Sequence, residues 1–273
     1  MSEGASTRTR KGGGGSSRHP RGVSKSGSFN EEHVKLSKKL SAVLRHRIAE
    51  NGLTDVLRPD GFVPLSRLLA TPGFRGVGID QIKSIVESND KQRFSISEED
   101  GQIFIRANQG HTSSGIDESQ LLERMDEDAL RAIGAGRAVH GTYRAAWKTI
   151  TSSGGLSPMS RHHVHLAADL PGESGVISGM RASAEIHIWV DMLAASRAGI
   201  PFFRSANGVI LTPGLADTRL LPSNYFHRVL DPQRNLEWRD GEWQAAAPAA
   251  AAAAAVAAAS SAADAKQIAA GCR

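Results

Sequence analysis

Arginine and histidine side chains stand where the apolar patterns of the chain end, a placement that suits the binding of an anion. Arg45 and His46 close a helix-like run, Arg106 closes a strand-like run, and Arg181 follows the segment 177–180. A guanidinium group donates two parallel hydrogen bonds to phosphate oxygens, and a histidine exchanges a proton near neutral pH. Singly, each residue is more readily explained as a solvated charge or a surface ion pair. Together they indicate an anion site of the kind that holds a phosphate.

A cluster of histidines, His162, His163 and His165, follows Arg161 and raises metal binding as a different chemistry. Alternate residues share one face of a strand, so two of these rings could act together. No carboxylate or cysteine near them in the sequence completes a ligand set, and we therefore predict no metal site. His165 is equally well explained as a satisfied, inward-facing histidine. The chain also lacks the glycine-rich turn of a Rossmann domain, the Walker A lysine loop and the HExxH zinc motif.

The segment 28–114 has the pattern of three short helices followed by a β-hairpin. Ser28 and Glu31 have the spacing of a capping box before a helix that ends near 45–47. Further helices are predicted at 65–69 and 80–87, and strands at 93–97 and 103–106 flank the turn signal Asp100-Gly101. This order is typical of a winged helix, a variant of the helix-turn-helix plan.

The pattern changes after a linker and helix that we place at 115–135, where the acidic run 117–128 is best explained as a helix surface. Helices are then predicted at 143–152 and near 191–198, and strands at 138–142, 163–166, 175–177, 185–191, 202–204 and 209–211. Many short strands with few helices predict an α+β, sheet-dominated second domain over 136–240. Its tryptophans are expected to pack in the core or at its edges rather than to stack on bases.

The two ends of the chain have compositions that cannot bury a core. Residues 1–27 are mostly Gly, Ser, Arg and Lys and predict a disordered basic tail, and 241–273 predict an Ala-rich, low-complexity tail. The formal charge of +5 favours a polyanionic partner, and the basic tail either adds nonspecific phosphate attraction or is simply solvated.

Composition also limits the redox chemistry and the cellular location. Cys272 is the only cysteine, which excludes an intrachain disulfide. No apolar run is long enough to span a bilayer, and the N-terminus lacks the apolar core of a secretory signal. We expect a monomer in the cytoplasm or nucleus, and the Arg- and Ser-rich start leaves organelle targeting open.

Several stretches of the sequence resemble the tRNA 2′-phosphotransferase family, in the family's order and over about 34–229. The matching stretches are 36–46, 60–65, 105–112, 139–142, 155–166, 175–181 and 207–212. The most specific are Ile105-Arg106-Ala107-Asn108-Gln109-Gly110-His111-Thr112 and Gly175-Val176-Ile177-Ser178-Gly179-Met180-Arg181. The Leu-rich first helix alone would be a weak signal.

The resemblance implies a winged-helix, RNA-binding lobe in front of a mixed α/β-sheet domain like that of the ADP-ribosyltransferases. It implies NAD⁺ as co-substrate, no metal, and a tRNA with an internal 2′-phosphate as partner. The 2′-phosphate would attack C1″ of the nicotinamide ribose and expel nicotinamide, giving a 2′-phospho-ADP-ribosylated RNA. The ribose 2″-hydroxyl would then attack phosphorus, releasing RNA with a free 2′-hydroxyl and ADP-ribose 1″,2″-cyclic phosphate.

The resemblance also implies roles for individual residues, carried over by position. The catalytic group would be Arg45, His46, Arg106 and Arg181, with the arginines clamping the phosphate and His46 protonating the departing oxygen or aligning the phosphate. NAD⁺ contacts are expected from His140, Gly141, Thr142, Leu156, Arg161, His163, Ser178 and Gly179. RNA contacts are expected from Lys38, Lys39, Asn108, Gln109 and His111. Gly141 is expected to let the chain approach the ligand closely.

Two other functions remain open from the sequence. The same arginines could hold a terminal phosphate in an ADP-ribosyltransferase that caps nucleic-acid 5′-phosphates or modifies proteins. Alternatively, the first domain could belong to a noncatalytic RNA-binding protein. The enzyme reading predicts that Arg181 is essential for turnover, whereas the RNA-binding reading predicts that it is dispensable.

Overall fold

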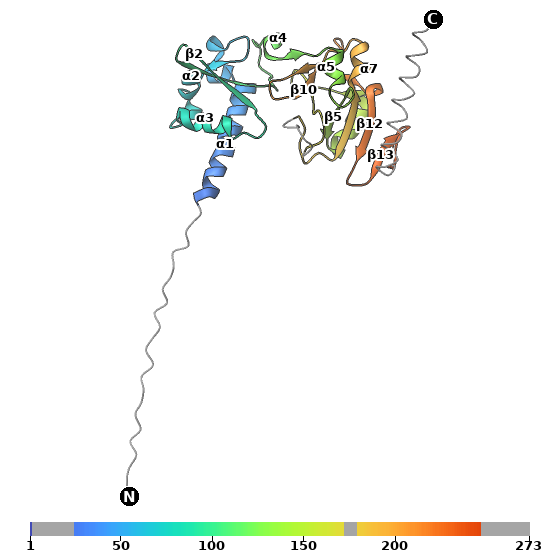
Figure 1. Cartoon of the computed structure of the whole chain (residues 1–273), viewed down its shortest axis with the longest axis horizontal. Helices are drawn as coiled ribbons and strands as arrows, with labels where there is room; N and C mark the ends of the chain where they lie inside the picture. Colours follow the sequence, from blue (N-terminus) through green and yellow to red (C-terminus); the bar gives the residue numbers. More distant parts are fainter. Residues whose placement is uncertain (2–24, 172–178, 247–273) are drawn as a thin grey trace.

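A computed structural model of the chain describes Met1, residues 25–171 and residues 179–246, and it shows two units joined near the short helix α4 (Figure 1). Residues 2–24 of the predicted tail 1–27, residues 247–273 of the predicted tail 241–273, and the strand predicted at 175–177 lie outside the described residues. No helix among the described residues is long and apolar enough to cross a membrane.

The first unit packs three helices on a small antiparallel sheet. Its elements are α1 (Lys25–His46), β1 (Val63–Pro64), α2 (Leu65–Leu69), α3 (Ile79–Glu87), β2 (Phe94–Glu99) and β3 (Gln102–Ala107), with single 3₁₀ turns at Ala49–Asn51, Thr54–Val56 and Pro72–Phe74. The sheet order is β1-β3-β2, and the core gathers Leu40, Leu44, Leu65, Phe74, Ile82 and Ile105. The predicted helices 65–69 and 80–87 and the predicted hairpin are confirmed.

The hairpin turn has the backbone that its sequence requires. Asp100 and Gly101 both have positive φ, 48° and 74°, which is the conformation of the two-residue turns that match strand twist. The predicted start of the first helix is wrong, because α1 begins at Lys25, before the Ser28–Glu31 pair that was taken as its capping box. Its predicted end is confirmed at His46.

The second unit contains three sheets among its described residues. Its helices are α4 (Glu118–Leu121), α5 (Glu127–Arg131), α6 (Arg144–Ser153) and α7 (Met192–Arg197), with a 3₁₀ turn at Ser223–Tyr225. Its strands are β4 (Glu123–Arg124), β5 (Arg137–Thr142), β6 (Gly155–Leu156), β7 (Val164–Leu166), β8 (Ile186–Asp191), β9 (Phe203–Arg204), β10 (Ile210–Thr212), β11 (Leu221–Pro222), β12 (Phe226–Asp231), β13 (Leu236–Arg239) and β14 (Glu242–Ala245). The sheet orders are β14-β13-β12-β8-β5, β4-β9-β10-β7 and β11-β6.

Two of these sheets meet where β5 approaches the end of β7. Val139 and Ala167 form an isolated bridge, with backbone hydrogen bonds of 2.9 and 2.8 Å in the two directions. Residues of both sheets, including Leu166, Ile188, Val190 and Ile210, share one core. The sheet-dominated α+β character expected of this domain is therefore present.

The last hairpin corrects the predicted end of the folded region. Strand β14 continues the five-stranded sheet to Ala245, so residues 242–245 belong to the sheet and Gly241 to its last turn, not to the Ala-rich tail. Trp238 and Trp243 of this hairpin contact Trp147 of α6, with ring centroids 5.3 and 5.6 Å away. Trp147 is buried, and the other tryptophans are partly buried against core clusters, as predicted.

Contacts between the units tie the exit of β3 to β7. The side-chain amide of Gln109 lies 3.0 Å from Nε2 of His165, and the backbone N–H of His162 donates to the carbonyl of His111. The side-chain amide of Asn207 donates to the carbonyl of Lys91 at 2.9 Å. The first two contacts hold the segment after β3 against β7 and the loop before it.

Candidate active site

Arg45 is the most constrained cation of this region. It is half-buried at the end of α1, and its carbonyl accepts a 2.9 Å hydrogen bond from the backbone N–H of Thr112. Its Nε and one terminal nitrogen are buried without a hydrogen-bond partner within the described chain. Burial, followed by the charges of Arg161 and Arg93, lowers the pKa of Arg45 to about 10. A buried cation with unused donors is costly in the free protein and well prepared for an anion.

His111 lies close to both Arg45 and Arg106, since the charges of both lower its pKa. Arg106 sits 4.6 Å above the ring of Phe62 and donates one 2.9 Å hydrogen bond to the carbonyl of Asp60, which fixes its orientation. Its Nε is buried and unpartnered among the residues described. The pKa of His111 is lowered to about 3 by burial and then by the charge of Arg45, with a smaller effect of Arg106.

Arg161 extends this positive region into the second unit. Its pKa is lowered by burial and then by the charge of Arg181, while its own charge lowers the pKa of Arg45. Arg181 is exposed, lines the pocket of the second unit, and stands 6.0 Å from the ring of Tyr143. Arg45, Arg161 and Arg181 thus lie in one continuous field, with Arg161 as the link between the lobes, and Arg106 is related to Arg45 through His111.

His46 lies at the exposed edge of this field. Its Nδ1 is 3.0 Å from the hydroxyl of Thr112, and its pKa is lowered from the ordinary value by burial and by the charges of Arg45 and Arg161. The ring is therefore neutral at pH 7. A doubly charged phosphate held beside it would oppose that shift and favour the protonated ring.

A pocket of about 410 Å³ opens between β5, α6 and β7 of the second unit. Six of the residues predicted to contact the cofactor or the phosphate line it: His140, Thr142, Leu156, Arg161, His163 and Arg181. The volume falls within the range of about 300–1,000 Å³ that is typical of small-molecule sites. The other side chains that line the pocket are largely small or apolar.

Two histidines fix the back of this pocket. His140 donates from Nδ1 to the carbonyl oxygen of His165 at 2.9 Å, and burial lowers its pKa. The ring is therefore neutral, and its Nε2 is left as a hydrogen-bond acceptor. Both ring nitrogens of His165 lie 3.0 Å from an oxygen, Nδ1 from the carbonyl oxygen of His163 and Nε2 from Oε1 of Gln109, and a neutral ring can donate to one of them. His165 is thus the inward-facing histidine that the sequence allowed, and it joins the two lobes.

The structure gives Gly141 a packing role, and the close approach to a ligand that was expected of it stays a prediction. A Cβ at this position would lie 2.1 Å from Cγ and 2.4 Å from Sδ of Met180, and 2.8 Å from Cβ of Ala184. The space beside Gly141 is therefore filled by Met180, the residue before Arg181. We conclude that the missing side chain of Gly141 leaves room for Met180 and so allows the segment that carries Arg181 to pack against β5.

Substitution Gly141→Ala tests this packing role. We expect a loss of stability of about 1–3 kcal/mol, the usual cost of overpacking a filled core. The double variant Gly141→Ala/Met180→Ala should recover part of that loss, because the shortened side chain removes the two closest contacts and leaves the contact with Ala184. Thermal denaturation of the three proteins measures the effect. Equal melting temperatures for the single and double variants would contradict the assignment.

Two further predicted cofactor contacts have different outcomes. Gly179 has a φ of 114°, and a Cβ there would lie 2.7 Å from the carbonyl oxygen of Leu166 and 2.8 Å from Cα of Ala167. Only glycine fits this approach to β7, so Gly179 positions the chain that leads to Arg181. Ser178 lies outside the described residues.

Most of the residues predicted to contact RNA have partners within the chain, and their contacts with RNA stay a prediction. Asn108 is buried, donates to the carbonyl of Gln92 at 2.7 Å and accepts from Ser95 at 2.7 Å. Gln109 and His111 are also buried, at the junction of the lobes. Lys39 donates to the carbonyl of Gly73 at 2.6 Å. Lys38, in contrast, is exposed on α1.

The sequence did not predict the contacts of Glu118 with two histidines of the loop 161–163. Glu118, at the start of α4, lies 2.8 Å from Nδ1 of His162 and 3.3 Å from Nε2 of His163. The acidic run was interpreted as a helix surface, but this residue anchors the loop that carries Arg161. Glu118 and the two histidines are far apart in the sequence, so no local pattern predicts the contact. Within the parts of the chain that the structure describes, no group of three His, Cys, Asp or Glu side chains could hold a metal ion.

The buried histidines make the protein sensitive to mild acid. The pKa values of His111 and His165 are both lowered to about 3, first by burial. In the unfolded chain they protonate near pH 6.5, so the unfolded state binds more protons between about pH 6.5 and 3, and stability is lost across that window. We expect each to cost up to about 2 kcal/mol between pH 6.5 and 5.

Urea denaturation followed by circular dichroism at pH 7 and pH 5 checks this expectation. The other histidines with a lowered pKa act in the same direction, and they are His46, His140, His163, His187 and His227. The variant His165→Gln, which keeps an amide-sized partner for Gln109, should show a shallower pH dependence. Identical midpoints at both pH values would show that these rings are not held neutral.

Comparison with known proteins gives a consistent result. The family model for "RNA 2′-phosphotransferase, Tpt1 / KptA family" matches residues 31–214. The chain is 46% identical over 207 residues to tRNA 2′-phosphotransferase 1 of Danio rerio, covering 74% of this chain and 88% of that protein. It is 45% identical over 202 residues to tRNA 2′-phosphotransferase 1 of Homo sapiens, covering 73% and 76%. A relative in Schizosaccharomyces pombe is 43% identical over 209 residues, which cover 77% of this chain but about half, 52%, of the relative.

Proposed function

This chain belongs to the RNA 2′-phosphotransferase (Tpt1/KptA) family, and from that premise we propose that it removes the 2′-phosphate at the splice junction of a ligated tRNA, using NAD⁺ as acceptor. The products would be RNA with a free 2′-hydroxyl, nicotinamide and ADP-ribose 1″,2″-cyclic phosphate. The proposal includes the fold: the first lobe, with α1–α3 and the β2–β3 hairpin, would be a winged helix, and the second lobe would be ADP-ribosyltransferase-like.

The observation that carries the proposal is the positive field shared by the two lobes. Arg45 keeps two buried nitrogens without partners among the described residues, and it is close enough to Arg161 for the charge of one to lower the pKa of the other. Arg161 is related in the same way to Arg181. An RNA 2′-phosphate carries up to two charges and three exposed oxygens, so it could satisfy guanidinium groups from both lobes at once.

The pocket of the second lobe suits NAD⁺. A neutral His140 offers Nε2 as an acceptor for a ribose hydroxyl, and Arg161 in the pocket wall is suited to a pyrophosphate. Bound NAD⁺ would supply C1″ of its nicotinamide ribose as the electrophile, with nicotinamide as the leaving group. Thr142 and Leu156 close the same wall, and Arg181 at its edge lies beside the phosphate field.

The residues of the first lobe supply orientation and charge neutralisation. The attacking phosphate oxygen is already anionic, so no general base is needed to create it. Arg45 and Arg106 would hold the phosphate and offset the charge that develops when its bond to the RNA 2′-oxygen breaks. His46, protonated once the dianion is bound, would give its proton to the departing 2′-oxygen.

The test is to incubate the purified full chain with NAD⁺ and a short RNA that carries one internal 2′-phosphate, with EDTA present. We expect mass spectrometry to find dephosphorylated RNA, nicotinamide and the cyclic phosphate product in equal amounts. An RNA with only a 5′-phosphate serves as the comparison substrate. ADP-ribosylation of that RNA, with the 2′-phosphate left intact, would replace the proposal with a capping activity.

A further inference from the structure

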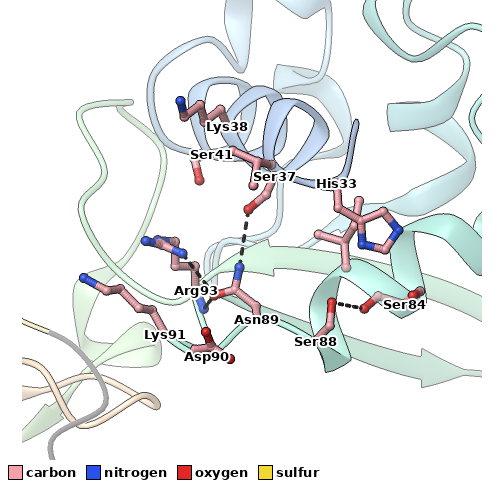
Figure 2. A pocket seen from close by; sticks show the side chains of 12 residues that line it. His33, Ser37, Lys38, Ser41, Ser84, Ser88, Asn89, Asp90, Lys91 and Arg93 are labelled. Carbon is pink, nitrogen blue, oxygen red and sulfur yellow. Dashed lines mark hydrogen bonds between the residues drawn. The ribbon is translucent and has the colours of Figure 1, made fainter. Parts of the chain in front are cut away.

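A second hollow, of about 730 Å³, lies wholly within the first lobe, between α1 and the segment that joins α3 to β2 (Figure 2). We call it the α1–α3 groove. Its walls are formed by His33, Val34, Ser37, Lys38, Ser41, Ser84, Ile85, Ser88, Asn89, Asp90, Lys91 and Arg93. It is distinct from the pocket of the second lobe, and the residues of that pocket do not line it.

The groove is positively charged along one side. Lys38 comes from α1 and Lys91 and Arg93 from the segment after α3, and Figure 2 shows all three on the same side of the groove. Asp90 is the one carboxylate among the lining residues. Arg93 donates to the side-chain oxygen of Asn89 at 3.2 Å, and burial lowers its pKa.

The remaining wall is rich in small polar groups. Four serine hydroxyls line it, and the amide of Asn89 donates to Ser37 at 3.3 Å (Figure 2). No Phe, Tyr or Trp side chain takes part in this wall of the described lobe. Lysine, arginine, serine and asparagine are the usual partners of phosphate and sugar oxygens, whereas reading of unpaired bases relies on aromatic stacking. The groove therefore suits a sugar–phosphate backbone better than it suits exposed bases.

The groove leads into the region of the phosphate arginines. At one end, Arg93 is close enough to Arg45 for its charge to lower the pKa of Arg45. At the same end, the amino group of Lys91 lies 3.5 Å from the carbonyl oxygen of Met180, the residue before Arg181. An RNA strand bound near Arg45 and Arg181 could therefore continue directly into the groove.

We propose that the α1–α3 groove holds the RNA strand that flanks the 2′-phosphate, with Lys38, Lys91 and Arg93 contacting successive phosphodiesters. The inference rests on the proposed function for the identity of the reacting group, and it adds a backbone-reading site beyond the catalytic centre. Binding through phosphodiesters makes the affinity dependent on RNA length and salt, and tolerant of sequence.

The experiment compares two substrates and three proteins. The short substrate is a 2′-phosphorylated dinucleotide, and the long substrate is a ten-nucleotide RNA with the same central dinucleotide. The proteins are the unmodified full chain, Lys38→Glu in the groove, and Lys35→Glu as the matched control. Lys35 is an exposed lysine of the same helix, and it lines a different hollow from the groove.

In the unmodified chain we expect a clearly lower KM for the long than for the short substrate at low salt. Lys38→Glu should reduce the ratio of the short-substrate KM to the long-substrate KM by a factor on the order of ten. It should also reduce the salt dependence of the affinity for the long RNA by the equivalent of about one phosphate contact. Lys35→Glu should keep the ratio of the unmodified chain. Scrambling the flanking sequence should change the ratio little.

The outcomes separate the groove from the proposed function. If the short substrate is processed but length brings no gain, or if Lys35→Glu and Lys38→Glu behave alike, the groove assignment is overturned. If neither substrate is processed, filter binding of the long RNA still tests the groove, and selective weakening by Lys38→Glu would support it while the proposed function fails. Binding that depends on the flanking sequence would overturn the backbone-reading role.

Discussion

Replacing Arg45 with alanine is expected to lower kcat/KM for 2′-phosphate removal by a factor on the order of 10²–10³, the usual effect of deleting one preorganised donor to developing charge. Arg45 combines burial, two nitrogens without partners in the described chain, and a pKa lowered to about 10. Its donors are therefore already desolvated and oriented before substrate arrives. Steady-state kinetics with the 2′-phosphorylated RNA measures the loss.

Three further variants sharpen this result. Arg45→Lys should restore only part of the activity, because an ammonium group lacks the bidentate fork. Arg47→Ala is the matched control, since Arg47 is an exposed arginine two residues along, 3.7 Å from Glu50. Arg45→Met should raise the melting temperature by about 2–4 °C per kcal/mol gained, because it removes an unpaired, half-buried charge. A variant that is both less stable and fully active would overturn the assignment of Arg45.

Arg181→Ala is expected to cause a comparable loss, about 10²–10³ in kcat/KM, with little change in stability. The side chain is exposed and belongs to the second lobe, yet it lines the pocket and its charge acts on Arg161. The substitution therefore separates catalysis from folding more cleanly than any change in the buried part of the field. It also distinguishes an enzyme from a protein that only binds RNA through its first lobe.

Arg124→Ala provides the control for Arg181. Arg124 is an exposed arginine of β4 in the same lobe, and it does not line the pocket. We expect this variant to retain the kinetics and the melting temperature of the unmodified chain. RNA binding measured for Arg181→Ala should weaken less than turnover does, because Lys38, Arg45 and Arg106 of the first lobe are intact. Full turnover by Arg181→Ala would remove the second lobe from the phosphate site.

Local patterns predicted the elements with strong periodicity or distinctive turns. The hairpin at Asp100-Gly101, the helix α6 and the strand β8 follow from alternation, turn chemistry and an amphipathic repeat. The start of α1 and the final hairpin β13–β14 were predicted wrongly. In the second case the hairpin's strands are polar outside their tryptophans, and their stability comes from packing on Trp147, which lies far away in the sequence.

The residue types of the proposed site were predictable from the sequence, but the contacts that connect them were not. The positions of Arg45, Arg106 and Arg181 at the ends of elements indicated an anion site, and the resemblance to a family indicated which anion. The linking role of Arg161, the anchoring of its loop by Glu118 and the packing role of Gly141 depend on contacts between distant segments. Arg93 was missed because one arginine at the start of a strand has no local pattern that distinguishes it from a solvated surface charge.

The distribution of tryptophan gives the molecule an internal reporter of its two lobes. All four tryptophans, at 147, 189, 238 and 243, belong to the second lobe, and three of them form one contact cluster. Tryptophan fluorescence therefore reports on the second lobe alone, whereas the far-ultraviolet circular dichroism signal of helices includes the long helix α1 of the first lobe. Coincident transitions of the two signals would mean that the bonds through Gln109 and Asn207 make the lobes fold as one cooperative body.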